Sequence, residues 1–315
     1  MDYITHSPDN TRVQYYRTLS DLALVCKFFR ALAVPHLFRS LEISGLSGKT
    51  RSNDSVSFNN AAFSRSLIAG DKRAISYATF VRSVALQDWL PQDHPGAAWT
   101  VPVFLCMYGK AIKCMPHLHS LELSRISVDR PLLKAICALE RLTTLRFVDC
   151  SFELVRSQMG AREVISDLPP RRLKEFSFST SSDPEPFLLE LLHRITNLAN
   201  LERIAVLHSS AVAEAILSWI PENNVLKRLE IGEVKDVPVL WTALERCKCL
   251  EQLEVGCLDG DPTVHDSLPV LFLPLLRKVV SSSPVLLRLV KQGARGIYTF
   301  DRRQFGDTFP IVSCD

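Results

Sequence analysis

The stretch LKRLEI, residues 226–231, follows a pattern of apolar-x-x-apolar-x-apolar that recurs through most of the chain. Six further copies are Val81–Leu86, LHSLEL from Leu118, LTTLRF from Leu142, LKEFSF from Leu173, LERIAV from Leu201 and LEQLEV from Leu250. Phe38–Ile43 obeys the same rule, and a degenerate copy lies near Leu276–Val279. Neighbouring copies start 24 (226 to 250) to 37 (81 to 118) residues apart. A period of this size is typical of a repeat architecture.

Each copy of the pattern predicts a strand, and each segment between copies predicts a helix. The last four residues of a copy alternate apolar and polar, as in a strand with one buried face. In the intervening segments the apolar spacing is nearer 3.6 residues. Pro131 is expected at a first helical position, with Ser210 and Asp236 as helix N-caps. The apolar spacing of residues 185–195 also predicts a helix.

A single strand and helix cannot bury its own apolar face, so the units must stack on one another. The pattern resembles the leucine-rich repeat, L-x-x-L-x-L-x-x-N/C-x-L, of an irregular kind with long helices outside. Cys150 occupies the Asn/Cys position of the copy that starts at Leu142. The resemblance predicts an α/β leucine-rich-repeat solenoid, a curved parallel sheet with outer helices. The alternative is a doubly wound parallel sheet, which usually shows longer Val/Ile runs and a glycine fingerprint.

Composition excludes several functional classes. With 315 residues, 47% hydrophobic content and a formal net charge of +3, the chain predicts a sizeable core and no nucleic-acid partner. Nine cysteines, mostly in apolar runs, indicate reduced core thiols rather than disulfides. The N-terminal residues do not resemble a signal peptide, and no apolar run is long enough to span a membrane. We therefore expect a cytoplasmic or nuclear protein.

The sequence offers no strong candidate for catalysis, metal binding or cofactor binding. Cys247, Cys249, Cys257 and His265 form a conceivable zinc set, but C-x-C is an unusual spacing and a strand is predicted between its members. GLSGKT, from Gly45, lacks the first glycine of a phosphate-binding loop. We predict no enzyme, and a small-molecule α/β enzyme stays the least favoured alternative.

The N-terminal stretch SDLALVCKFFRALAVPHLFRSLEI, residues 20–43, combines a helix signal with the first predicted strand. One helix is expected, capped at Ser20 or Asp21 and ended by Pro35. Its apolar face would hold Leu22, Val25, Phe29 and Leu32. In the simplest interpretation, this helix is a cap that shields the end of the repeat array.

The same stretch resembles the C-terminal half of an F-box, V-C-K-x-W-R followed by L-A-x-x-x-L-[FWY]-R. The matching residues are Val25, Cys26, Lys27, Phe29 in place of the usual Trp, Arg30, Leu32, Ala33, Leu37, Phe38 and Arg39. The family's opening L-P-x-E-type helix has no counterpart in this sequence. The resemblance therefore assigns contacts with a Skp-family adaptor to Leu22, Leu24, Val25, Cys26 and Phe29.

An F-box followed by leucine-rich repeats implies a substrate-recognition subunit of a cullin-type ubiquitin ligase, joined to the cullin through the adaptor. The predicted organisation is an F-box-like segment at 1–43, a polar connection with a helix at 44–79, irregular repeats at 80–281 and a C-terminal cap at 282–315. The alternative is a stand-alone leucine-rich-repeat module that binds proteins without a ligase role.

A target protein would bind the residues that alternate with the buried ones on each strand. We expect them on the concave surface, and the charged members are Glu122, Arg146, Glu175, Arg203, Arg228, Glu230 and Glu254. Arginine forks suit carboxylates and phosphates. The hypothesis is that Arg146, Arg203 and Arg228 form a column that meets a carboxylate or a phosphorylated segment of the target.

Overall fold

The computed structural model describes residues 8–45, 54–90, 99–152, 173–180, 186–258 and 271–281. The chain divides into two compact units, Met1–Pro169 and Pro170–Asp315. The predicted C-terminal cap at 282–315, His265 of the conceivable zinc set and most of the GLSGKT stretch lie outside the described residues. The predicted segment boundaries at 43, 79 and 281 stay predictions.

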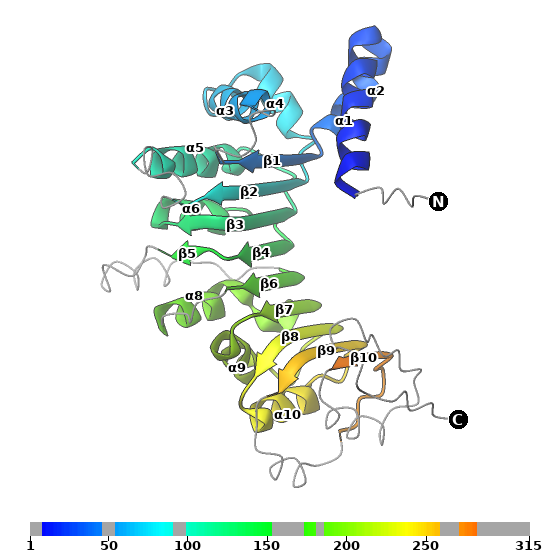
Figure 1. Cartoon of the computed structure of the whole chain (residues 1–315), viewed down its shortest axis with the longest axis vertical. Helices are drawn as coiled ribbons and strands as arrows, with labels where there is room; N and C mark the ends of the chain where they lie inside the picture. The colour runs from blue at the N-terminus through cyan, green and yellow to red at the C-terminus, as the bar shows by residue number, and fades with distance from the viewer. Residues whose placement is uncertain are drawn as a thin grey trace, which may run out of the picture. The chain divides into compact units, whose positions relative to one another are not determined.

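The first unit alternates helices and parallel strands after an N-terminal pair of helices (Figure 1). Its elements are α1 (Pro8–Val25), α2 (Lys27–Leu37), β1 (Ser40–Ser44), α3 (Asp54–Ile68), α4 (Lys72–Ala78), β2 (Ser83–Trp89), α5 (Val101–Lys113), β3 (Ser120–Val128), α6 (Arg130–Cys137), β4 (Thr144–Val148) and β5 (Ser151–Phe152). β1, β2, β3 and β4 pair in chain order, and the short β5 pairs with the end of β3.

The second unit repeats the same plan. Its elements are β6 (Glu175–Ser179), α8 (Pro186–Thr196), the 3-10 helix η3 (Leu198–Asn200), β7 (Arg203–Leu207), α9 (Ser210–Trp219), β8 (Arg228–Val234), α10 (Val237–Arg246), β9 (Gln252–Leu258) and β10 (Lys278–Ser281). The strands β6 to β10 again pair in parallel and in chain order.

Strand order decides between the two predicted folds. A doubly wound sheet reverses its strand order at a switch point and carries helices on both faces. Within each unit the order runs on without reversal, and the helices between strands, from α5 to α10, are drawn on one side of the strands (Figure 1). Each unit is therefore a stack of leucine-rich-repeat-type coils in an α/β solenoid arrangement, as the repeat pattern predicts.

The register places the repeated apolar residues in continuous buried rows. In the first unit, Ile43, Leu86, Leu123 and Phe147 are successive partners across β1 to β4, and each is at most 2% exposed. The second unit has the matching row of Phe178, Val206, Ile231 and Val255. Each fully buried side chain of this size contributes about 1.5–3 kcal/mol. Because consecutive coils supply consecutive members, no coil could bury its own residues alone.

Hydrogen bonds between coils follow the same repeat. The carbonyl of Arg39 accepts from the N–H groups of Arg82 and Ser83, at 2.9 and 3.1 Å. The carbonyls with the same double role in later coils belong to Arg82, His119, Lys174, Glu202, Lys227 and Glu251. The residue just before each of these strands is thus structurally equivalent from coil to coil. Its side chain projects at the edge where the strands begin.

Cys150, at the Asn/Cys position of the repeat, contacts the preceding coil. Its side chain is 8% exposed, and its Sγ donates to the carbonyl of Leu123 in the preceding coil, at 3.2 Å. This bond links the loop after β4 to the backbone of β3. The cysteine therefore makes the coil-to-coil contact that the consensus residue makes in regular repeats.

The N-terminal helix prediction was wrong in its bounds. Ser20 and Asp21 lie inside α1, which begins at Pro8, a residue suited to a first helical turn. The helix is interrupted at Cys26, whose backbone is extended (φ −161°, ψ 169°). A second helix, α2, then continues through Pro35. Pro35 has no N–H to donate to the carbonyl four residues earlier, and α2 ends two residues after it, at Leu37.

One N-cap was placed a residue too late. Ser209, not Ser210, caps α9, and its hydroxyl accepts from the N–H of Val212 at 3.4 Å. The predicted cap Asp236 is confirmed, because its carboxylate accepts from the N–H of Val239 at 3.1 Å. Adjacent serines give the same sequence signal, so only the backbone angles distinguish them.

Replacing Gly256 by alanine should lower the free energy of unfolding by about 1–3 kcal/mol, the usual cost of overpacking. A Cβ on Gly256 would press against the backbone carbonyl of Gly232, and one on Gly232 would lie 3.1 Å from the backbone N of His208. Backbone cannot rotate away as a side chain can. Urea denaturation measures the loss, with Gln252→Ala, at an exposed position of the same strand, as the control. Equal stability of the two variants would contradict this close approach.

Candidate interaction surfaces

The helices α1 and α2 pack against each other as a hairpin at the start of the first unit. The second half of α2 is anchored to the rest of the unit. Ala33 is 2% exposed, and the ring of Phe38, which follows the helix, stacks on Tyr77 with centroids 4.6 Å apart. Arg30 donates to the Tyr77 hydroxyl at 3.4 Å. Most side chains described in the two helices are exposed.

An apolar patch lies at the junction of these two helices. Leu24, Val25 and Phe28 are 85%, 66% and 66% exposed, which is unusual for residues so hydrophobic. Leu22, Phe29 and Leu32 are partly exposed, and Cys26 is exposed between them. A simple cap would bury these side chains against the first strand. We call the set Leu22, Leu24, Val25, Cys26, Phe28, Phe29 and Leu32 the hairpin patch.

The hairpin patch contains all five residues that the F-box resemblance assigns to adaptor contact. The resemblance did not include Phe28, because the family motif has a variable residue there. Its ring lies edge-on to that of Phe29, with centroids 5.6 Å apart. The interruption at Cys26 places Leu24 and Phe28 in different helices, and both side chains are strongly exposed. The spacing of a single helix could not reveal this.

The face of the first sheet that alternates with the core carries a few charged residues. Glu122 on β3 and Arg146 on β4 are register partners, and their side chains approach to 4.0 Å. Both are more than a third exposed. A pair in such contact with water contributes little to stability.

In the second unit the alternating face carries a denser charge network. Glu175, Arg203 and Arg228 are successive partners across β6, β7 and β8. The Glu230 carboxylate lies 3.5 Å from the Arg203 guanidinium and 3.3 Å from that of Arg228. Arg228 also reaches Glu254, at 3.9 Å.

These pairs change what the predicted arginine column can do. Arg203 and Arg228 are neighbours, as predicted, whereas Arg146 belongs to the other unit. Each of the three guanidinium groups already faces a carboxylate of its own sheet. An incoming anion would have to displace those carboxylates, so this face is better suited to mixed polar contacts than to tight anion binding.

Burial keeps two core thiols protonated. It raises the pKa of Cys150 to about 11 and that of Cys247 to about 12. Of the conceivable zinc set, Cys249 is half-buried and Cys257 is exposed. The described residues contain no group of three His, Cys, Asp or Glu side chains that could hold a metal ion. Nor does any helix in the described part of the chain combine the length and apolarity needed to cross a membrane.

Alkylation at neutral pH should therefore divide the described cysteines into two classes. The thiolate is the reactive form, so Cys150 and Cys247 should label only after denaturation. The exposed Cys26, Cys114 and Cys257 should label in the native protein. Iodoacetamide treatment followed by peptide mass spectrometry measures this. Native labelling of Cys150 or Cys247 as fast as Cys114 would contradict their burial.

Comparison with known proteins adds little to this description. No family model matches the chain, and no curated protein sequence matches it. Among solved structures, an internalin from Listeria monocytogenes aligns over 76% of this chain and 71% of that chain, with 14% identity and a TM-score of 0.34. The assignment of leucine-rich-repeat coils rests instead on the strand order, register and buried rows of the two units.

Proposed function

We propose that this protein is a substrate-recognition subunit of a cullin-type ubiquitin ligase, which binds a Skp-family adaptor through the hairpin patch and a target protein through its repeat coils. The observation that carries the proposal is the exposure of the patch. The F-box resemblance assigns adaptor contact to Leu22, Leu24, Val25, Cys26 and Phe29, and these side chains face solvent at least in part. Several large apolar side chains exposed within one short stretch of chain favour a surface that a partner covers.

The proposed mechanism is tethering, with no bond chemistry by this chain. Through the adaptor, the ligase would hold the target near the ubiquitin to be transferred, which raises the effective concentration of the two reactants. A repeat fold suits this role, because successive strands offer an extended surface while each coil depends only on its neighbours.

Titration of the whole chain with a purified Skp-family adaptor in a calorimeter tests the proposal. We expect a dissociation constant of about 1 µM or tighter, which corresponds to about −8 kcal/mol. A folded protein that shows no heat of binding at roughly a hundredfold higher concentration would refute the ligase role and leave the stand-alone interaction module. Because the measurement needs no target protein, it does not depend on knowing the target.

A further inference from the structure

The edge where the strands begin has a different charge in each unit. The residue just before a strand is structurally equivalent from coil to coil, as its doubly accepting carbonyl shows. In the second unit these residues alternate in sign, and they are Lys174, Glu202, Lys227, Glu251 and Arg277. In the first unit they are Arg39, Arg82, His119 and Thr143, which include no acid.

The second unit neutralises its own edge. The Glu202 carboxylate lies 3.0 Å from the Lys174 ammonium and 2.8 Å from that of Lys227. Hydrogen bonds from Lys227 and Lys174 lower the pKa of Glu202, so the carboxylate stays ionised between them. This edge therefore has little unbalanced charge to offer a ligand.

The first unit leaves the same edge unbalanced. Within the described residues, no carboxylate forms an ion pair with Arg39, Arg82 or His119. The Arg82 guanidinium is held in place because its Nη1 donates to the carbonyls of Thr79 and Val81, at 2.7 and 3.2 Å. Neighbouring strands lie about 4.8 Å apart, so these basic side chains start from closely spaced positions. Such a row favours the binding of an anion.

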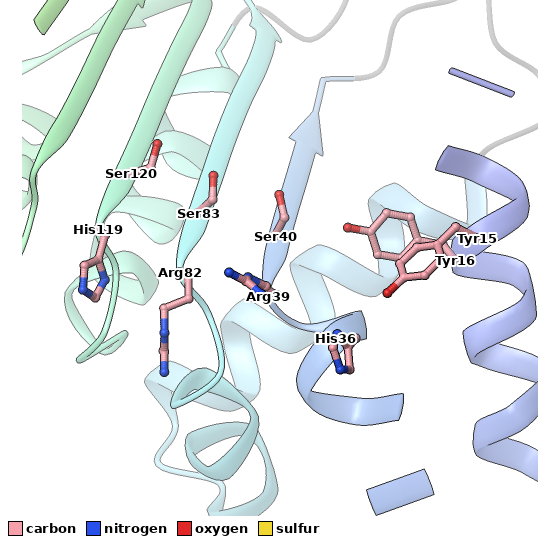
Figure 2. A pocket seen from close by; sticks show the side chains of 9 residues that line it. All are labelled: Tyr15, Tyr16, His36, Arg39, Ser40, Arg82, Ser83, His119 and Ser120. Carbon is pink, nitrogen blue, oxygen red and sulfur yellow. The ribbon is translucent and has the colours of Figure 1, made fainter. Parts of the chain in front are cut away.

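A hollow of about 430 Å³ lies over this edge (Figure 2). Ser40, Ser83 and Ser120, which are register partners on β1, β2 and β3, form a second row beside the row of Arg39, Arg82 and His119. Tyr15 and Tyr16 come from α1, and His36 from α2 (Figure 2). The lining therefore combines two guanidinium groups, two imidazoles, three serine hydroxyls and two phenols, without a carboxylate.

The surroundings limit where an anion could sit. Glu42 and Glu122 lie two residues further along the strands than Ser40 and Ser120, about 7 Å away. Both would repel negative charge in that direction. Beyond the other end, Arg141 donates to the His117 ring at 2.7 Å, which adds positive charge near His119. Desolvation, with the nearby Arg82, Arg141 and His119, lowers the pKa of His117, as expected in a positive field.

We propose that this hollow binds a phosphoryl group on an extended segment of a partner protein. Guanidinium forks and hydroxyl donors match the oxygens of a phosphate, and the row of donors at the strand starts supplies several at once. Tyr15, which is 51% exposed, offers an aromatic wall for residues that flank the phosphorylated one. The inference rests on the proposed function in one respect, which is that the segment belongs to a target protein. It needs neither the adaptor nor the hairpin patch.

The test measures binding of three probes to the whole chain without adaptor. They are a degenerate peptide library with a fixed phosphoserine, the same library with serine, and inorganic phosphate. We expect the phosphoserine library to bind at least about tenfold more tightly than either of the others. Equal binding of the two libraries would overturn the proposal. Equal affinity for inorganic phosphate would overturn its assignment to a protein segment and identify a free-anion site.

The double variant Arg39→Gln with His119→Gln locates the site. Both side chains are exposed, so the fold should survive, which a urea denaturation curve checks. We expect at least about a tenfold loss of affinity for the phosphoserine library. Arg277→Gln, at the equivalent position of the second unit, should leave affinity unchanged. An unaltered affinity in the folded double variant would refute the site, whereas loss of adaptor binding alone would leave this proposal intact.

Discussion

Replacing Phe147 by alanine should lower the free energy of unfolding by about 3–5 kcal/mol, the range measured when a large aromatic side chain is removed from a packed core. Phe147 is fully buried on β4, and its register partner on β3 is the buried Leu123. Its ring also lies 5.5 Å from that of Phe152, between centroids. The side chain therefore joins one coil to the next, and its removal weakens the interface on which a stack of coils depends.

Urea denaturation followed by circular dichroism measures this loss, and Thr144→Ala is the matched control. Thr144 lies on the same strand but on the alternating face, where it is half-buried. Its replacement should change the free energy of unfolding by no more than about 0.5 kcal/mol. If Phe147→Ala cost less than about 1 kcal/mol, the buried row would not be a core shared between coils, and the solenoid arrangement of the first unit would be in doubt.

The double variant Leu24→Ala with Phe28→Ala should bind a Skp-family adaptor at least about a hundredfold more weakly, a loss of about 2.7 kcal/mol. These two side chains are among the most exposed of the hairpin patch and come from α1 and α2. Large apolar residues at the centre of an interface often contribute 2 kcal/mol or more each when truncated. Because both face solvent in the free protein, their truncation should scarcely change its stability.

Ile75→Ala provides the matched control for the adaptor experiment. Ile75 is an exposed apolar residue, at 47%, but it lies on α4, outside the hairpin patch. In calorimetry, Ile75→Ala should bind the adaptor with the same affinity as the unaltered chain. Phe29→Ala is a poorer choice, because that ring is 39% exposed and its loss would also disturb packing. Adaptor binding by the Leu24 and Phe28 variant at full strength would show that another surface makes the contact.

The residues proposed for adaptor contact and the residues of the hollow differ in how they are spread along the sequence. The F-box resemblance names a short contiguous motif, so it located five residues of the hairpin patch. The hollow joins Tyr15 and Tyr16 of α1 to the starts of β1, β2 and β3, which come from widely separated parts of the sequence. Arg39, Arg82 and His119 share no local motif. Only the register, which aligns the residues before each strand, could have brought them together.

The sequence by itself determined the repeating strand and helix, since the Leu-x-x-Leu-x-Leu pattern specifies which side of each strand is buried. The pattern also required the coils to stack, because the apolar side chains of one coil cannot be buried within that coil alone. Tertiary structure alone decided which polar side chains are neutralised and which are left exposed. Glu230 on β8 offsets Arg203 of the neighbouring strand β7 as well as Arg228 of its own strand, whereas Arg39 and Arg82 meet no such carboxylate among the described residues. Pairing of this kind depends on distances of a few ångströms between coils, and a linear pattern of residues does not contain them.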